Sequence, residues 1–582
     1  MVGMMRKEPV RRKRRCCTLP CSSDPGSNMT LAPRHTLLSL IAVFSASAFA
    51  ADHAGPIDPQ RLSQTVKELA ADEFEGRAPG TPGETKTIEW LTNRFRQLGL
   101  EPGGERGSWT QAVPLVRTQI GSPAKLSIAV EGKERLLTQS TDVYVSTVRK
   151  VDRVSIEAAP VVFVGYGVTA PERQWDDYKQ VDLRGKVAVY LINDPDFYAQ
   201  AGEPVAGRFG ARRMTYYGRW TYKFEEASRR GALAALIVHD TEGAGYGWST
   251  VIAPAGENYD IVRENPNERV LLQGWLARAA ADEIFKSAGL DLADLSARAR
   301  RADFSPVELK NVRFDASLPV TATLAESRNF LARIPGSKRP GETIMFAAHW
   351  DAYGIGPPDA QGHRIRPGAN DDALGLAGVL ELARAFKAEA QPERTLVFAA
   401  WTAEERGLLG SQAYAAKPLY PVAKTVANLT LDILQTAGLS KDVLLVGAGQ
   451  SELEDDLARA AAAQGRVVTP ESLPERGLFY RADHFPLARK GVPVLLLMGI
   501  SGAADLREGG REAGNRWLEG YMRCYHQPCD AWDASWDFRG AAQDVELFHT
   551  IGKSLANSTR WPQWRTESEF FKERATSDGE RR

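Results

Sequence analysis

The sequence has no excess charge of either sign, no internal repeats and, after its first 50 residues, no hydrophobic run long enough to cross a membrane. It contains 73 Lys and Arg against 73 Asp and Glu, a formal net charge of zero. This balance gives no indication of nucleic acid or an anionic membrane as a partner. With 43% hydrophobic and 25% charged residues, the composition is typical of a globular protein. We expect no stable membrane insertion of the mature chain.

One apolar run lies near the N-terminus, at residues 37–50. It is too short to span a bilayer comfortably. It ends in Ala-Phe-Ala, a small-x-small sequence typical of signal-peptide cleavage sites. Met29 is a better start for such a signal, so we interpret residues 1–28 as an extension from a mis-called start. A nuclear-type signal is the alternative for their R-R-K-R-R run. We therefore expect an exported protein, periplasmic or secreted.

Cysteine is scarce. Five occur, and three of them lie within residues 1–28, which leaves Cys524 and Cys529 in the mature chain. An exported compartment permits a disulfide. We hypothesise that these two cysteines are bonded and fix the loop around His526, with an unbonded pair as the alternative.

Hydrophobic periodicity predicts an α/β fold, a three-layer sandwich with a mostly parallel central sheet and an inserted α+β module. Strands are expected at 343–348, 395–400, 425–432 and 491–498. The expected division is a signal peptide with its upstream extension at 1–50, the first part of the main domain at 51–135, the inserted module at 136–315, the main part at 316–565 and a charged, frayed tail at 566–582.

The stretch from 343 to 405 places polar residues after two apolar runs. His349 and Asp351 follow the first run, and Glu404 and Glu405 follow the second. A turn rich in Gly, Pro and Asn between them presents two adjacent aspartates before a helical pattern. Because sites in open α/β sheets lie outside the carboxyl ends of the strands, we expect these side chains to meet in one crevice.

Two further residues complete a set that could hold metal. Asp432 ends N-L-T-L-D, and His526 lies in Y-H-Q-P-C-D. With His349, Asp371 and Glu405 they supply imidazole nitrogens and carboxylate oxygens, the ligands that zinc accepts in proteins. Two zinc ions can share one hydroxide and stabilise both oxygens of a tetrahedral centre. The ordered set of five predicts a dinuclear zinc site for hydrolysis.

This set resembles the zinc aminopeptidase family that includes bacterial leucine-type aminopeptidases, glutamate carboxypeptidase II and the transferrin receptor ectodomain. The matching segments are H-W-D, G-A-N-D-D, A-E-E-R-G-L-L-G-S, N-L-T-L-D, R-A-D-H-F and Y-H-Q-P-C-D. The inserted module is similar to the protease-associated domain of larger members. The resemblance implies that His349 and Asp432 hold one zinc, that Glu405 and His526 hold the other, and that Asp371 bridges them.

The resemblance also implies roles for residues that do not bind metal. Glu404 would be the general base that takes a proton from water and gives it to the leaving amine. Asp351 would hydrogen-bond His349 and fix its tautomer. Tyr480 is a candidate oxyanion donor. The implied function is an aminopeptidase that hydrolyses N-terminal residues from peptides.

Three other functions stay open on the same scaffold. A glutamate-releasing carboxypeptidase needs cations to grip a C-terminal carboxylate, and Arg212, Arg213 and Arg481 are available. A glutaminyl cyclase would use one zinc. A receptor-like module would be non-catalytic, although no expected ligand is missing. Asp372 is interpreted as a cap of the following helix.

Overall fold

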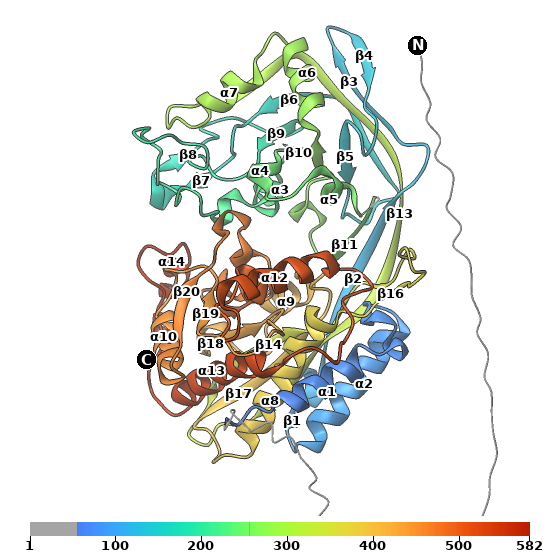
Figure 1. The fold of residues 1–582 in the computed structure, drawn as a ribbon. Helices are drawn as coiled ribbons and strands as arrows, with labels where there is room; N and C mark the ends of the chain where they lie inside the picture. The colour runs from blue at the N-terminus through green and yellow to red at the C-terminus, as the bar shows by residue number, and fades with distance from the viewer. Residues whose placement is uncertain (1–54, 255, 582) are drawn as a thin grey trace, which may run out of the picture. The chain divides into compact units, whose positions relative to one another are not determined.

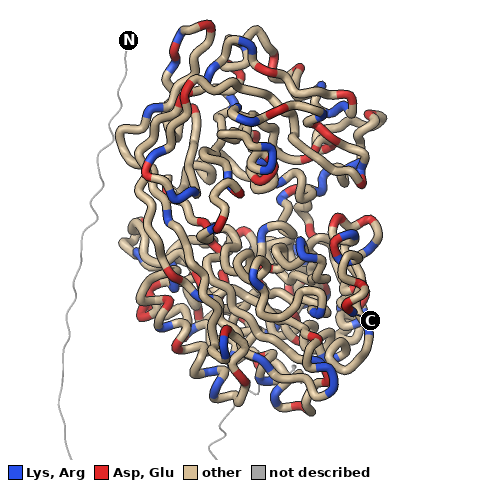
Figure 2. The backbone as a smooth tube through the Cα atoms, turned by 180° about the vertical axis from the view of Figure 1, so that it is seen from behind, with Lys and Arg blue, Asp and Glu red and all other residues tan. Residues whose placement is uncertain are grey.

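The computed structural model describes residues 55–254 and 256–581 (Figure 1). The predicted signal peptide and the predicted upstream extension lie outside these residues. No helix in the described ranges combines the length and the apolar character needed to cross a membrane. Basic and acidic residues are interspersed along the backbone in the view of Figure 2, and neither sign gathers in one region there.

A sheet of parallel strands carries the residues that the sequence predicts to bind metal. These strands are, in order, β21 (Val494–Leu497), β18 (Thr425–Leu431), β14 (Arg339–His349) and β17 (Arg394–Trp401). They confirm the four predicted strands and the α/β fold class. Their near-continuous apolar runs are buried on both faces, as expected of parallel strands covered by helices. In register, Ala347 lies opposite Ala399 on one side and Thr430 on the other, so the carboxyl ends finish at one edge.

Helices cover both faces of this sheet, which makes three layers. Odd and even positions of the strands face different cores: Phe346 and Phe398 belong to one, and Met345 and Val397 to the other. The first core is covered by α1 (Pro59–Leu69), α2 (Pro82–Gln97), α8 (Gly375–Lys387), α10 (Leu453–Ala463) and α13 (Arg539–Ala556). The second is covered by α9 (Leu409–Ala416) and α11 (His484–Ala488).

The long strand β13 (Val307–Ile334) connects this sheet with a second group of strands (Figure 1). Its C-terminal part pairs antiparallel with β17. Its other partners are β1 (Glu101–Pro102), β2 (Thr110–Ile120), β3 (Lys125–Val130) and β6 (Arg153–Phe163). Beyond β6 follow β9 (Val187–Leu191), β10 (Ala234–Val238), β12 (Leu272–Leu276) and the antiparallel β5 (Val143–Ser146).

The second group of strands has its own two cores. Val189 faces a core with α6 (Arg278–Ser287) and α7 (Leu292–Arg298), whereas Tyr190 faces a core with α3 (Trp220–Arg229). This segment is therefore an α+β structure. The predicted domain boundaries at 136 and 315 stay a prediction.

Shorter elements complete the described chain. The strands are β4 (Lys133–Leu136), β7 (Thr169–Ala170), β8 (Trp175–Asp176), β11 (Glu257–Ile261), β15 (Gly354–Ile355), β16 (Ile365–Arg366), β19 (Asp442–Leu445) and β20 (Val467–Pro470). The helices are α4 (Thr241–Ala244), α5 (Trp248–Ile252), α12 (Gly510–Cys524) and α14 (Phe571–Ala575).

The expectation of a frayed C-terminal tail is wrong. Phe570 and Arg574 are buried. Phe570 packs against Trp564 and Phe485, and Arg574 donates a hydrogen bond to the carbonyl of Thr425. The many charges of this segment predicted exposure, but its few large side chains attach it to the fold.

A buried arginine fixes the turn that precedes the two adjacent aspartates. The Arg77 guanidinium is fully buried. It donates to the backbone carbonyls of Leu69 and Trp350 at 2.8 Å each, of Pro367 at 2.6 Å and of Gly368 at 2.8 Å. One side chain thus joins the N-terminal helices, the end of β14 and the loop before Asp371.

We predict that Arg77→Met destabilises the protein by about 3 kcal/mol or more, because each buried carbonyl left without a donor costs about 1–3 kcal/mol. Urea unfolding of the variant and of wild type measures this difference. Arg301→Met is the matched control, since the Arg301 side chain forms an exposed ion pair with Asp303 and such pairs contribute little to stability. Equal losses in both variants would contradict the assigned role of Arg77.

Candidate metal centre

The predicted ligands come from separate elements that end at the same edge of the sheet. His349 is the last residue of β14, and Asp432 follows β18 directly. Glu405 lies four residues beyond the end of β17 at Trp401. Asp371 lies in a tight turn, Ala369–Leu374, before α8, and His526 follows α12. Parallel strands deliver their C-terminal residues to one crevice, so the structure brings all five predicted ligands together.

The carboxylate of Asp371 lies between the two histidines. Its Oδ1 is 3.1 Å from Nε2 of His349, and its Oδ2 is 3.1 Å from Nε2 of His526. Glu405 Oε2 is 3.2 Å from the same His526 nitrogen, and Asp432 Oδ1 is 4.0 Å from the His349 nitrogen. The ligand atoms therefore form two groups, one around each imidazole, with Asp371 touching both.

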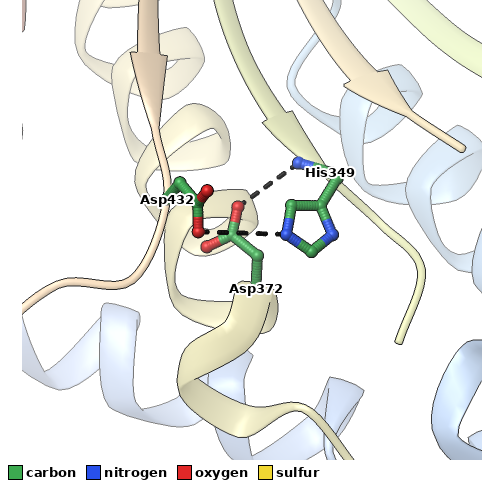
Figure 3. Close-up of side chains that lie close together, drawn as sticks. All are labelled: His349, Asp372 and Asp432. Atoms are coloured by element: carbon green, nitrogen blue, oxygen red, sulfur yellow. Dashed lines mark hydrogen bonds and ion pairs between the residues drawn. The ribbon is translucent and has the colours of Figure 1, made fainter. Parts of the chain in front are cut away.

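Asp372 also lies beside His349 and Asp432 (Figure 3), and its carboxylate could join that group. Its oxygens, however, already accept backbone N–H groups, from Gly375 at 2.8 Å, His349 at 3.3 Å and Ile433 at 3.4 Å. Gly375 begins α8. These contacts agree with the interpretation of Asp372 as the residue that caps this helix.

The unpaired atoms of the cluster fit a metal ion. His349 Nε2, His526 Nε2 and Asp432 Oδ1 are buried without a hydrogen-bond partner, although most buried polar atoms in proteins are paired. The other ring nitrogen of His349 lies 3.0 Å from the carbonyl oxygen of Asp351. A hydrogen bond there leaves the Nε2 lone pair directed at the cluster. Imidazole nitrogen and carboxylate oxygen together suit zinc.

The electrostatics of the cluster also call for a cation. Burial raises the pKa of Glu404 and of Glu405 well above their usual range, and neighbouring carboxylates raise them further. Burial and the charge of Asp371 raise the pKa of Asp432 to about 7. Divalent cations bound among such groups favour the ionised carboxylates, so a metal would offset the repulsion between them.

Glu404 lies beside the two groups and is fixed by Asp351. Its backbone N–H donates to Asp351 Oδ1 at 3.0 Å. Its Oε2 is 3.9 Å from His349 Nε2, which places its carboxylate next to the cluster. Asp351 was expected to hydrogen-bond His349 and fix its tautomer. Its carbonyl oxygen lies 3.0 Å from Nδ1 of His349, and its carboxylate lies 3.7 Å from the same nitrogen.

The expectation that Tyr480 is an oxyanion donor is not supported. Its ring packs against Tyr216 and Phe485, because the turn before α11 directs Tyr480 into a hydrophobic core. Burial raises the pKa of its phenol well above the usual range, and the charge of Glu569 in the tail adds to this effect. Sequence position alone could not distinguish this direction from one toward the metal ligands.

Two tyrosines that the sequence did not single out lie closer to the cluster. The ring of Tyr525 is 3.6 Å from that of His526 between centroids, and the ring of Tyr353 is 4.4 Å from it. The charge of Asp371 raises the pKa of both phenols in addition to the larger effect of burial. The sequence contained one indication of this position, because Tyr525 directly precedes the predicted ligand His526.

Asp530 is a second residue that sequence reasoning missed. Its carboxylate accepts the backbone N–H groups of Asn370 at 3.0 Å and of Asp371 at 3.1 Å. It therefore fixes the turn that carries the shared carboxylate. Asp530 is the last residue of Y-H-Q-P-C-D, so the motif contained it without revealing its role.

The hypothesised disulfide between Cys524 and Cys529 is present in the structure. It closes a loop of which His526 is part, with the two Cα atoms 5.1 Å apart. His526 itself has a positive φ of 61°, a conformation uncommon for residues other than glycine. The covalent closure therefore helps to hold this histidine in place.

Comparison with known proteins gives three kinds of match. Residues 329–548 match peptidase family M28. "Leupeptin-inactivating enzyme 1" of Streptomyces exfoliatus is 30% identical over 216 residues, 36% of this chain and 44% of that protein. A "Probable zinc metalloprotease" of Pyrenophora tritici-repentis is 39% identical over 104 residues, 18% of this chain and 23% of that protein. The chain thus spans less than half the length of these relatives.

Among solved structures, an aminopeptidase from Aneurinibacillus sp. strain AM-1 is similar with a TM-score of 0.46 and 18% identity. The match covers 87% of this chain and 96% of that one. None of these matches tests the protease-associated character of the inserted segment, which stays a prediction.

The family match includes every predicted metal ligand from His349 to His526. Residues 329–548 therefore belong to peptidase family M28.

Proposed function

We propose that the protein is a zinc-dependent aminopeptidase with two zinc ions in its centre. The observation that carries the proposal is the position of Asp371, whose two oxygens each lie 3.1 Å from a different histidine nitrogen. A carboxylate placed in this way can bridge two metals. A site for one metal would not need a shared ligand, and this argues against the cyclase alternative.

The assigned ligands follow the two groups of atoms. His349 and Asp432 would hold one zinc, Glu405 and His526 the other, and Asp371 would contribute one oxygen to each. When bound there, zinc would polarise the scissile carbonyl and favour deprotonation of water. The donor set supports this assignment because each group combines one imidazole with carboxylate oxygens.

Glu404 would move the proton. Its carboxylate borders the cluster without being needed as a ligand, and its backbone is held by Asp351. Glu404 would accept a proton from the attacking water and donate it to the leaving amine. The phenol of Tyr525, whose ring centroid lies 3.6 Å from that of His526, would donate a hydrogen bond to the carbonyl oxygen as negative charge develops there.

Three features support export and the aminopeptidase specificity. The predicted signal peptide would direct the chain out of the cytoplasm, and the disulfide between Cys524 and Cys529 suits an oxidising compartment. We therefore propose a periplasmic or secreted enzyme. The carboxylates around Asp371 and Glu404 give the crevice a negative field that suits the free α-ammonium group of a peptide.

The proposal is tested with three kinds of peptide: free-amine peptides, the same peptides with a blocked N-terminus, and N-blocked peptides that end in glutamate. We expect the zinc-loaded protein to hydrolyse only the first kind, releasing the N-terminal residue. Hydrolysis of N-blocked peptides with release of C-terminal glutamate would contradict the aminopeptidase proposal and favour the carboxypeptidase. Cyclisation of N-terminal glutamine would favour the cyclase.

Replacing Glu404 should lower the catalytic rate, whereas replacing its neighbour Glu405 should lower zinc affinity. Glu404→Gln keeps the shape of the side chain but removes its ability to take a proton, so we expect kcat to fall by about 10²–10⁴ while zinc content stays near wild type. Glu405→Gln should lower zinc affinity. Kinetics and metal analysis of both variants provide the test, each variant serving as the other's control. A Glu404→Gln protein with full activity would place the base elsewhere.

Loss of the disulfide should affect the metal more than the fold. The loop between Cys524 and Cys529 is short, so we expect the double variant Cys524→Ser, Cys529→Ser to lose less than the roughly 3 kcal/mol expected for a 15-residue loop. Zinc affinity at the position held by His526 should fall, because the loop no longer fixes this ligand. Urea unfolding and zinc titration measure the two effects. Unchanged zinc affinity would contradict the assigned role of the loop.

A further inference from the structure

The two histidines of the metal centre are held in different ways. The Nδ1 atom of His349 lies 3.0 Å from the carbonyl oxygen of Asp351, and a hydrogen bond of this kind commonly fixes the ring of a metal-binding histidine. In residues 55–254 and 256–581 no group forms such a bond with Nδ1 of His526. The orientation of the His526 ring therefore depends on the groups that pack against it.

Two aromatic rings pack against His526. The ring of its sequence neighbour Tyr525 lies 3.6 Å away between centroids, and the ring of Tyr353 lies 4.4 Å away with the two planes 39° apart. Tyr353 comes from the loop between β14 and β15, so chain connectivity does not place it beside the histidine. Within the described part of the chain, no hydrogen bond or ion pair holds the Tyr353 side chain. Another contact must keep its ring in position.

Arg406 supplies this contact. Its guanidinium carbon lies 5.1 Å from the ring centroid of Tyr353 and 5.1 Å from that of Tyr259 in β11. A cation within about 6 Å of a ring centroid is attracted to the aromatic face, and the attraction strengthens when water is excluded. All three side chains are partly buried. The guanidinium forms no ion pair or hydrogen bond with any described residue, so the two rings are its partners.

Arg489 shows how the arrangement of Arg406 differs from that of an arginine held by a carboxylate. Arg489 also lies over a ring, that of Tyr216 at 4.9 Å, but its two terminal nitrogens donate to the carboxylate of Glu225 at 3.1 and 3.0 Å. That carboxylate fixes the guanidinium of Arg489. The position of the Arg406 guanidinium is instead tied to the rings on which it lies, and in turn their positions depend on it.

We propose that Arg406 is a positioning residue for the metal ligand His526. By bridging the faces of Tyr259 and Tyr353, it holds the Tyr353 ring against the imidazole. A series of contacts thus runs from β11, which pairs with β2, through Arg406 and Tyr353 to a ligand whose ring has no hydrogen bond of its own at Nδ1. The inference rests on the proposed two-zinc centre and deepens it by naming what orients one of its ligands.

Competition titration with a chromogenic zinc chelator tests the proposal, because it measures the affinity of each zinc position in the purified protein. Arg406→Met removes the cation and keeps an unbranched side chain, so we expect affinity at the position held by His526 to fall by about 3- to 30-fold, the range of cation–π contacts. Arg406→Lys keeps a cation and should retain most of the affinity. Arg96→Met is the matched control and should change nothing, since Arg96 lies over Trp109 at 6.0 Å from α2.

A double-mutant cycle assigns the effect to the correct histidine. In a His526→Ala background, Arg406→Met should leave the affinity for the remaining zinc unchanged. Tyr353→Leu should reproduce the loss and add little to that of Arg406→Met, because both act through the same ring. Tyr259→Leu removes one of the two faces and should weaken the same position by about two- to fivefold. The two tyrosine variants apply the same test if Arg406→Met does not fold.

The outcomes separate the positioning role from the metal centre. An arginine with a merely structural role would lower the stability of the zinc-free protein in urea unfolding and leave zinc affinity unchanged. That result, or an equal loss of affinity in the His526→Ala background, would overturn the positioning role while wild type still binds two zinc ions. Wild-type protein that binds fewer than two would overturn both proposals. A loss shared by Arg406→Met and Tyr353→Leu, spared in Arg406→Lys and absent without His526, would establish the role.

Discussion

The position of one carboxylate, that of Asp371 between His349 and His526, is the constraint on which much of the surrounding structure depends. Its turn is held from one side by Asp530, which accepts the N–H of Asp371. It is held from the other by Arg77, which donates to the carbonyl of Gly368. These contacts place a charged group in a buried site where solvent cannot orient it. The parallel strands then supply the remaining ligands at their carboxyl ends, a position set by the topology.

The sequence was sufficient to predict the parts that follow from strong local patterns. The four parallel strands are apolar runs with clear ends, and His349 and Asp432 lie at those ends, so their meeting followed from the sheet topology. The order of the ligand motifs along the chain resembles that of one family, and this resemblance indicated the fold. The disulfide was proposed because the two cysteines flank a predicted ligand.

Side-chain direction was harder to predict. Tyr480 lies next to R-A-D-H-F, yet its ring belongs to a hydrophobic core and packs against Tyr216 and Phe485. Asp351 contacts His349 mainly through its carbonyl oxygen. Both outcomes depend on which face of a turn is buried, and that is decided by contacts between residues far apart in the chain. The tail was misjudged for the same reason, since the burial of Phe570 requires a partner such as Phe485.

Diffraction data collected at the zinc absorption edge from crystals of the zinc-loaded protein would test the central claim most directly. The account predicts two anomalous peaks about 3.5–4 Å apart, one on each side of the Asp371 carboxylate. One peak should lie beside His349 and Asp432, and the other beside Glu405 and His526. A single peak, or a pair of peaks bridged by Asp372 instead of Asp371, would contradict it.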